Sequence, residues 1–131
     1  MANEFLAGRV AIDNFTLVSS AAAQTINNGV QIPGGVLVTG VTYMDAQART
    51  VAGDATYQPA IINTVLSSTQ YFVSTENISD FPAQTIVSAP ALLTAGGVYI
   101  AQPGELGMIY GASTSPITVS PTVFVGYIDI A

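Results

Sequence analysis

Several residue types with well-defined chemistry are missing from this chain of 131 residues. It has no Cys, so disulfides and thiolate zinc sites are excluded and packing must supply the stability. It also has no His, the commonest general base and transition-metal ligand in proteins, and it has no G-x-S-x-G nucleophile motif. A serine triad would therefore lack its usual base. We expect a protein that is not an enzyme and that carries no cofactor.

Basic residues are almost absent as well. Lys does not occur, and Arg9 and Arg49 stand against eight carboxylates, which gives a formal net charge of −6. Nucleic-acid binding depends on several Lys or Arg that neutralise phosphates, and two Arg cannot form such a patch. The same shortage disfavours anionic membranes, and no apolar run reaches the roughly 18 residues of a membrane span. We expect neither nucleic acid nor a membrane as a partner.

What the chain has in abundance is short runs of Val, Ile and Thr, separated by Gly, Pro, Asn and Ser. Such runs are typical of antiparallel strands. We predict an all-β, single-domain antiparallel β-sandwich, jelly-roll-like, with roughly eight to ten strands, because two packed sheets let each strand bury one face. The sandwich is expected over residues 10–131, after an N-terminal arm of residues 1–9. The predicted strands are 10–18, 31–32, 36–44, 57–66 (or 60–66), 70–74, 85–88, 98–102, 106–110, 117–119 and 122–130.

Two turn signals precede the strand predicted at 36–44. Residues 27–29 read Asn-Asn-Gly and favour a turn, because Asn and Gly tolerate positive φ. Pro33 cannot donate a ladder hydrogen bond, so a short strand must end there, and the following Gly34 and Gly35 permit a corner. A further hairpin turn is predicted at residues 67–69. We interpret these segments as structural rather than as parts of a site.

Two carboxylates flank the predicted loop 45–56. Asp45 and Asp54 could act as acid and base of a glycosidase if they approached within about 5 to 10 Å. Solvated loop charges explain them better, since the chain has no Trp to stack on a sugar. A small hydrolase is therefore only a minor hypothesis.

A second polar segment, residues 74–82, offers oxygen ligands of the kind that calcium prefers. They come from Glu76, Asn77, Ser79 and Asp80, in a spacing that matches no EF-hand. A turn with local Asx-type hydrogen bonds is the simpler explanation. We predict no metal, and calcium near Glu76 and Asp80 stays open.

Three stretches carry a resemblance to a known family. They are TINNGVQIPGGVLVTGVTYM (25–44), AGGVYIAQPGELGMIYGA (95–112) and SPITVSPTVFVGYIDIA (115–131). Together they resemble the small head decoration, or cement, proteins of tailed bacteriophages, which have a jelly-roll-like sandwich. The resemblance implies a virion structural protein, made in the host cytoplasm, that binds the outer surface of a capsid and stabilises it. It also implies the major capsid protein as partner and a trimer as the oligomeric state.

Composition supports a homo-oligomer independently, because 50% hydrophobic and only 8% charged residues leave apolar surface that one small sandwich cannot easily hide. The alternative function is a receptor- or glycan-binding module of a phage tail or fibre, although binding surfaces favour the Trp that this chain lacks.

The N-terminal arm and the two Arg are the candidate interface residues. Phe5 and Leu6 precede the first convincing strand, which suits an arm that orders against a neighbouring subunit or the capsid. The alternative is that they cover the end of this chain's own core. Arg9 and Arg49 could pair with a carboxylate of this chain, of another copy or of a partner, and Arg is enriched at interfaces. We therefore predict Phe5, Leu6, Arg9 and Arg49 at a capsid or subunit interface.

Overall fold

The chain forms strands and no helix wherever the computed structural model describes it, over residues 8–45, 54–77, 85–87 and 92–130. The strands in these ranges are β1 (Arg9–Asn14), β2 (Leu17–Ser20), β3 (Gln24–Ile32), β4 (Val36–Asp45), β5 (Thr56–Asn63), β6 (Ser68–Tyr71), β7 (Glu76–Asn77), β8 (Thr85–Val87), β9 (Val98–Ile100), β10 (Gly104–Tyr110), β11 (Ile117–Val119) and β12 (Thr122–Asp129).

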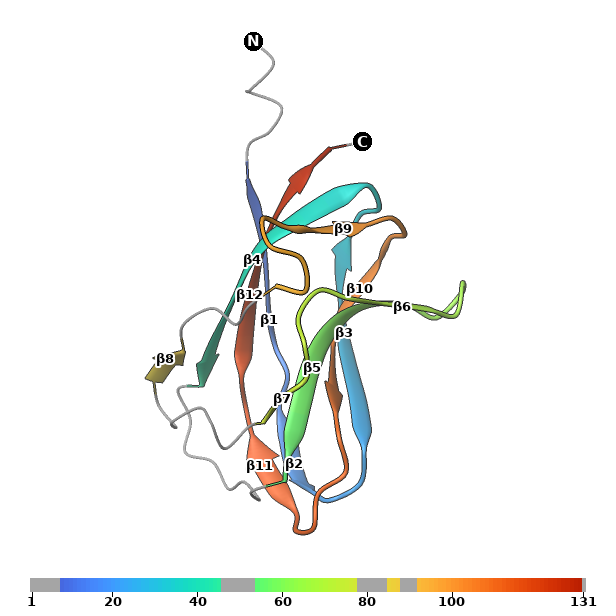
Figure 1. The fold of residues 1–131 in the computed structure, drawn as a ribbon. Helices are drawn as coiled ribbons and strands as arrows, with labels where there is room; N and C mark the ends of the chain where they lie inside the picture. Colours follow the sequence, from blue (N-terminus) through green and yellow to red (C-terminus); the bar gives the residue numbers. More distant parts are fainter. Residues whose placement is uncertain (1–7, 46–53, 78–84, 88–91, 131) are drawn as a thin grey trace.

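The strands build two main sheets that lie side by side as layers (Figure 1). One sheet has the order β1-β12-β4-β8, with β9 also paired to β4. The other has the order β3-β10-β5-β6, with β7 also paired to β5. β2 and β11 form a separate pair. All of these pairings are antiparallel.

The order of the strands identifies the topology. For this comparison we set aside the β2–β11 pair, count β6 with β7 as one strand, and count β8 with β9 as one strand. The described chain then has eight strands, and the first sheet holds the first, eighth, third and sixth of them in that spatial order. The second sheet holds the second, seventh, fourth and fifth. This is the arrangement of a jelly roll, in which two sheets share one core. The predicted jelly-roll-like sandwich is confirmed, although the described residues hold more and shorter strands than predicted.

A bulge in β4 determines which of its side chains reach the core. Val38 and Val41 are both buried, although strict alternation would put them on opposite faces of the sheet. The register between β4 and β12 shifts between Gly126 and Tyr127, which leaves Thr39 as an extra residue. Both halves of β4 therefore direct valines to the core. This explains why the sequence of β4 has apolar residues at both even-numbered and odd-numbered positions.

The corner at Pro33-Gly34-Gly35 is confirmed between β3 and β4. Gly35 has a φ of 74°, and a Cβ on Gly34 would lie 2.6 Å from the carbonyl oxygen of Ala101. The amide of Gly35 donates to the carbonyl of Ile100 at 2.8 Å. Glycine is required here because the backbone of the neighbouring segment lies so close.

The turn predicted at residues 27–29 is wrong. β3 continues through it, and Gly29 has a φ of 86°. The register with β10 shifts between Glu105 and Gly107, so this part of β3 forms a bulge. The expectation of positive φ was correct for Gly29, but the residue bends a strand instead of ending one.

Two other boundaries also differ from the prediction. The strand expected over 10–18 is divided into β1 and β2, because Phe15 leaves the first sheet and donates its amide to the carbonyl of Pro121 at 2.9 Å. The turn between β5 and β6 lies at residues 64–67 instead of 67–69, and Ser67 has a φ of 50°. Residues 1–7 of the predicted arm, 1–9, lie outside the described residues, and β1 begins at its last residue, Arg9.

A buried hydrogen bond joins the second sheet to the crossing between β1 and β2. Tyr110 ends β10 in the second sheet, and its hydroxyl donates to the carbonyl oxygen of Phe15 at 2.5 Å. Both residues are fully buried. Because a buried carbonyl without a donor is costly, this bond fixes the crossing from β1 to β2 against the end of β10.

We expect Tyr110→Phe to lower the free energy of unfolding by about 1 to 3 kcal/mol, because the carbonyl of Phe15 loses this donor in the core. For a domain of this size, that corresponds to a melting temperature lower by roughly 4 to 12 °C. Tyr71→Phe is the matched control, since Tyr71 is exposed on β6. Equal melting temperatures for the two variants, measured by calorimetry at one protein concentration, would contradict the assigned role.

Candidate functional site

The first sheet presents an apolar surface to solvent, which we call the outer apolar face and define by Val10, Ile12, Thr42, Met44 and Phe124. Val10 is 63% exposed and Ile12 is 52% exposed. Phe124 stands between Ile12 and Thr42 in the register of the three strands. Val10, Thr42, Met44 and Phe124 also line one shallow hollow. The face contains no charged side chain.

The alternation of the strands creates this face. In β1, Ala11 is buried, so its neighbours Val10 and Ile12 point away from the core. In β12, Val123 and Val125 are buried, so Phe124 between them also points outward. The sheet is therefore apolar on both sides, although only one side meets the core.

Two glycines leave room beside these side chains. Gly40 of β4 and Gly126 of β12 are paired in register, two residues along the strands from the Phe124–Thr42 pair. A Cβ on Gly40 would meet no atom within 4 Å. The middle of the sheet therefore has an open, flat area that side chains of another molecule can approach closely.

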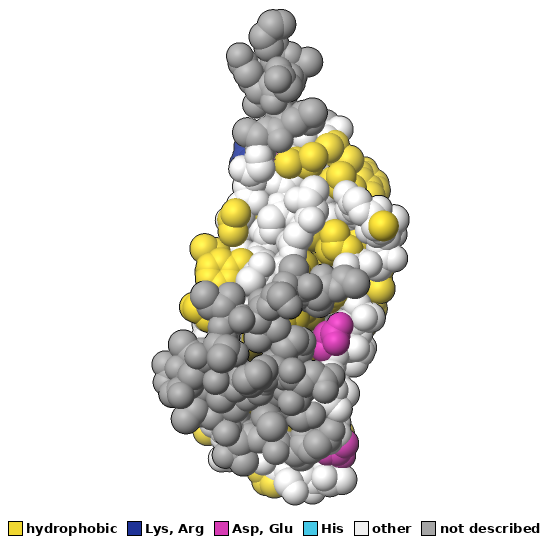
Figure 2. Space-filling model, turned by 60° about the vertical axis from the view of Figure 1, so that its left-hand side comes forward, with side chains coloured by type: hydrophobic (Ala, Val, Ile, Leu, Met, Phe, Trp, Pro, Cys, Tyr) yellow, Lys and Arg dark blue, Asp and Glu magenta, His cyan; other side chains and the backbone are white. Residues whose placement is uncertain are grey.

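The view in Figure 2 brings this side of the molecule forward. Hydrophobic side chains gather along its left edge and upper part, and the visible Asp and Glu groups lie toward the opposite edge. Contiguous apolar patches on a protein surface often mark sites of interaction with other molecules.

The outer face of the second sheet is different in character. It carries Asn27, Gln31, Gln58 and Glu105, and these polar groups are partly satisfied within the chain. Asn27 Nδ2 donates to Glu105 Oε2 at 2.7 Å, and Gln58 Nε2 donates to the carbonyl of Val73 at 2.9 Å. This second face is compatible with solvent, whereas the outer apolar face gains from being covered.

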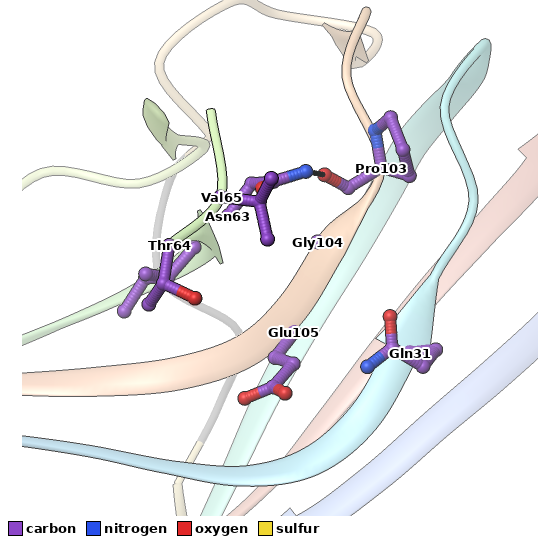
Figure 3. Close-up of a pocket in the computed structure, with 8 residues that line it drawn as sticks. Gln31, Asn63, Thr64, Val65, Pro103, Gly104 and Glu105 are labelled. Atoms are coloured by element: carbon purple, nitrogen blue, oxygen red, sulfur yellow. Dashed lines mark hydrogen bonds between the residues drawn. The ribbon is translucent and has the colours of Figure 1, made fainter. Parts of the chain in front are cut away.

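The second sheet also holds a hollow of about 220 Å³ next to Glu105 (Figure 3). We call it the Glu105 hollow. Its walls come from β3, from the end of β5 with the turn after it, and from the start of β10. The lining residues are Gln31, Ile62, Asn63, Thr64, Val65, Pro103, Gly104 and Glu105.

Of the predicted interface residues, the structure describes Arg9 alone; Phe5, Leu6 and Arg49 lie outside the described residues. Arg9 begins β1, and its Nε lies 3.1 Å from Oδ2 of Asp129 at the end of β12. The Arg9 side chain is 64% exposed, so this pair contributes only about 0 to 1 kcal/mol. The interface role of all four residues stays a prediction.

Asp54 has a structural role. The amide of Thr114 donates to its Oδ2 at 3.1 Å and to its Oδ1 at 3.3 Å, and the Thr114 hydroxyl donates to Oδ1 at 3.2 Å. Asp45 is the last residue of β4 and pairs with Thr85. These contacts favour the interpretation of Asp54 as a loop-holding group over that of a catalytic acid or base.

The hypothetical calcium loop is only partly described. Glu76 and Asn77 form β7, whereas Ser79 and Asp80 fall outside the described residues. Within the described ranges, no three Asp, Glu, His or Cys residues gather in a way that could hold a metal ion. Glu76 acts electrostatically on Tyr43. Burial raises the pKa of the Tyr43 phenol, and the negative charge of Glu76 raises this pKa further.

The described segments include no helix that is long and apolar enough to cross a membrane.

The residues of the outer apolar face were not identified from the sequence. The sequence did carry a sign of an apolar outer face, because the β12 segment TVFVGYID has apolar residues at both even-numbered and odd-numbered positions. Only the register with β1 and β4 shows which of these residues face outward together.

Comparison with known proteins adds evidence on the fold. No protein-family model matches the sequence, and no curated protein matches it. Among solved structures, a chain of the "Cyanophage Pam1 capsid asymmetric unit" is similar over 94% of this chain and 85% of its own, with a TM-score of 0.63 and 15% identity.

Two further structures are more distant. The acid-stable capsid structure of Helicobacter pylori bacteriophage KHP30 matches with a TM-score of 0.47 and 13% identity, over 90% of this chain and 93% of that chain. A Bacillus endospore appendage pilus matches with a TM-score of 0.40 and 13% identity, over 95% and 89%. The likeness to the Pam1 chain shows that this protein has a fold found in a phage capsid, and the other two are too distant to carry an argument.

We expect Asp54→Ala to lower the free energy of unfolding by about 0.5 to 1.5 kcal/mol, because Thr114 loses its acceptor. Asp54→Asn should lose less, since an amide oxygen can still accept the same bond. Thermal melts of the two variants beside the natural protein test this. Equal melting temperatures of the two variants would contradict the loop-holding role. So would a melting temperature of Asp54→Ala equal to that of the natural protein.

Proposed function

We propose that this protein is a virion structural protein that binds the outer surface of a phage capsid and stabilises it, as head decoration proteins do. The observation that carries the proposal is the outer apolar face of the first sheet, on a jelly-roll fold shared with a chain of the Cyanophage Pam1 capsid asymmetric unit. The partner is the major capsid protein, which the outer apolar face contacts. The protein is made in the host cytoplasm and performs no catalysis.

The energetics of the face support a protein partner. Full burial of a large apolar side chain contributes about 1.5 to 3 kcal/mol relative to exposure. Val10, Ile12 and Phe124 form a contiguous group. Burying them together against a partner offsets part of the free energy that association costs in lost translational and rotational freedom. Their flat sheet surface, with Gly40 and Gly126 beside them, suits a broad contact better than a small ligand.

Electrostatics favour the outer side of a capsid. A chain with a net charge of −6 and two Arg is repelled by packaged DNA, whereas the outer surface imposes no such penalty.

We further propose a homotrimer, as in the decoration proteins that the sequence resembles. Multi-angle light scattering should then give three times the chain mass of 13.5 kDa. A monomer at high micromolar concentration would contradict any oligomer, and a stable dimer would contradict the trimer.

We expect Phe124→Glu to reduce retention on capsids by at least about tenfold, because it places an unpaired charge in an apolar contact. Thr25→Glu is the matched control: it makes the same change in charge at an exposed position of β3, in the other sheet. Co-sedimentation with capsids that lack the protein measures retention, and thermal melts confirm that both variants fold.

Equal retention of the two variants would overturn the assignment of this face to the capsid. If Phe124→Glu instead dissociated the oligomer and left the retention of its subunits unchanged, the face would be a contact between copies of this chain, which also contradicts the assignment.

A further inference from the structure

Glu105 has an unusual position for a carboxylate. It lies on β10, the strand between β3 and β5, directly opposite Gln31 on one side and Ile62 on the other. Leu106 beside it is fully buried, so Glu105 points away from the core. Its Oε2 accepts a hydrogen bond from the neutral amide of Asn27 at 2.7 Å.

The charge of Glu105 has no cationic neighbour in the described part of the chain. The ion pair found there joins Arg9 and Asp129, on strands of the other sheet. The bond from Asn27 therefore positions the carboxylate without neutralising it. A half-buried carboxylate of this kind gains more from a cation than a fully solvated one does.

Glycines on β10 let Ile62 pack directly against the strand beside this carboxylate. A Cβ on Gly104 would lie 2.7 Å from the carbonyl oxygen of Ile62, and a Cβ on Gly107 would lie 2.6 Å from Ile62 Cδ1. Side chains are therefore excluded at both positions, and Ile62 lies close against β10. The hollow of about 220 Å³ lies beside this contact, with apolar Ile62 and acidic Glu105 among its lining residues.

The wall formed by the end of β5 and the turn after it is held in place by Asn63. Its Nδ2 donates to the carbonyl of Pro103 at 2.8 Å, drawn as the dashed line in Figure 3, and its Oδ1 accepts from the amide of Leu66 at 2.9 Å. These bonds fix the turn after β5 against the start of β10. Val65, which is 90% exposed, stands on this turn and is a further apolar lining residue.

We infer that the Glu105 hollow binds an arginine side chain of a partner protein. The guanidinium group donates in a planar fork that matches a carboxylate, and it is more weakly hydrated than the ammonium group of lysine. The aliphatic stem of an arginine packs along Ile62, Val65 and Pro103, while Gln31 lies on the other side of Glu105. A net charge of −6 attracts such a cationic group over a longer range.

The inference is tested on the isolated, full-length protein with N-acetyl-arginine amide, whose one charge is the guanidinium group. N-acetyl-citrulline amide is the neutral probe of nearly the same shape. We expect saturable NMR shifts in the side-chain amide signals of Asn27, Gln31 and Asn63 with the arginine probe, weaker at high salt, and none with the citrulline probe. Equal shifts with both probes, or no localised shift with the arginine probe, would overturn the inference.

Two variants locate the charge responsible. Glu105→Gln preserves the shape of the side chain and should weaken binding of the arginine probe by at least about tenfold. Asp54→Asn makes the same change in net charge next to the opposite end of β5, and it should bind as the natural protein does. If the two variants lost affinity equally, the binding would reflect overall charge and the hollow would not be its site.

This outcome is independent of the proposed function. The probes measure the hollow without any capsid, and the Phe124→Glu experiment measures capsid retention through the other sheet. Failure of one therefore leaves the result of the other intact.

Discussion

The antiparallel pairing of β1 with β12 is the constraint on which the rest of the structure depends, because it joins the beginning of the described chain to its end. Inside this pair a set of pairings is nested: β2 with β11, β3 with β10, β4 with β9, and β5 with β6. The pairings of β4 with β12 and of β5 with β10 then join neighbouring parts of this set within each sheet. The chain is thus one long hairpin that folds over into two sheets. Most contacts therefore join residues far apart in sequence, and such topologies gain stability only when both halves of the chain are present.

This arrangement also determines the character of the two outer faces. β12 lies between β1 and β4, so its outward residue Phe124 is flanked by outward residues of both neighbours. β10 lies between β3 and β5, so the same geometry surrounds Glu105 with Gln31 and Ile62. Similar positions in the two sheets therefore hold an apolar surface in one case and a carboxylate in the other.

The fold could be predicted from local patterns where turn chemistry and alternation agree. The Pro33-Gly34-Gly35 corner and the strand at residues 117–119 were predicted correctly, because proline fixes φ and ends a strand, whereas glycine permits the positive φ of the corner. Residues 27–29 were predicted as a turn but lie within β3, because a glycine with positive φ occurs in β-bulges as well as in turns. The outer apolar face and the Glu105 hollow could not be predicted, because each combines strands whose neighbours are set by the nested pairing.

In the two proposals above, the surfaces contribute to binding in different ways. Burial of Val10, Ile12 and Phe124 is non-directional and depends little on salt, so the outer apolar face provides affinity without fixing orientation. A carboxylate that meets a guanidinium group demands one geometry and weakens as salt rises, so the Glu105 hollow provides orientation. Because the surfaces lie on different sheets, one molecule can contact two neighbours at once. The proposed reinforcement of a capsid requires this property, since a molecule attached by a single surface connects nothing.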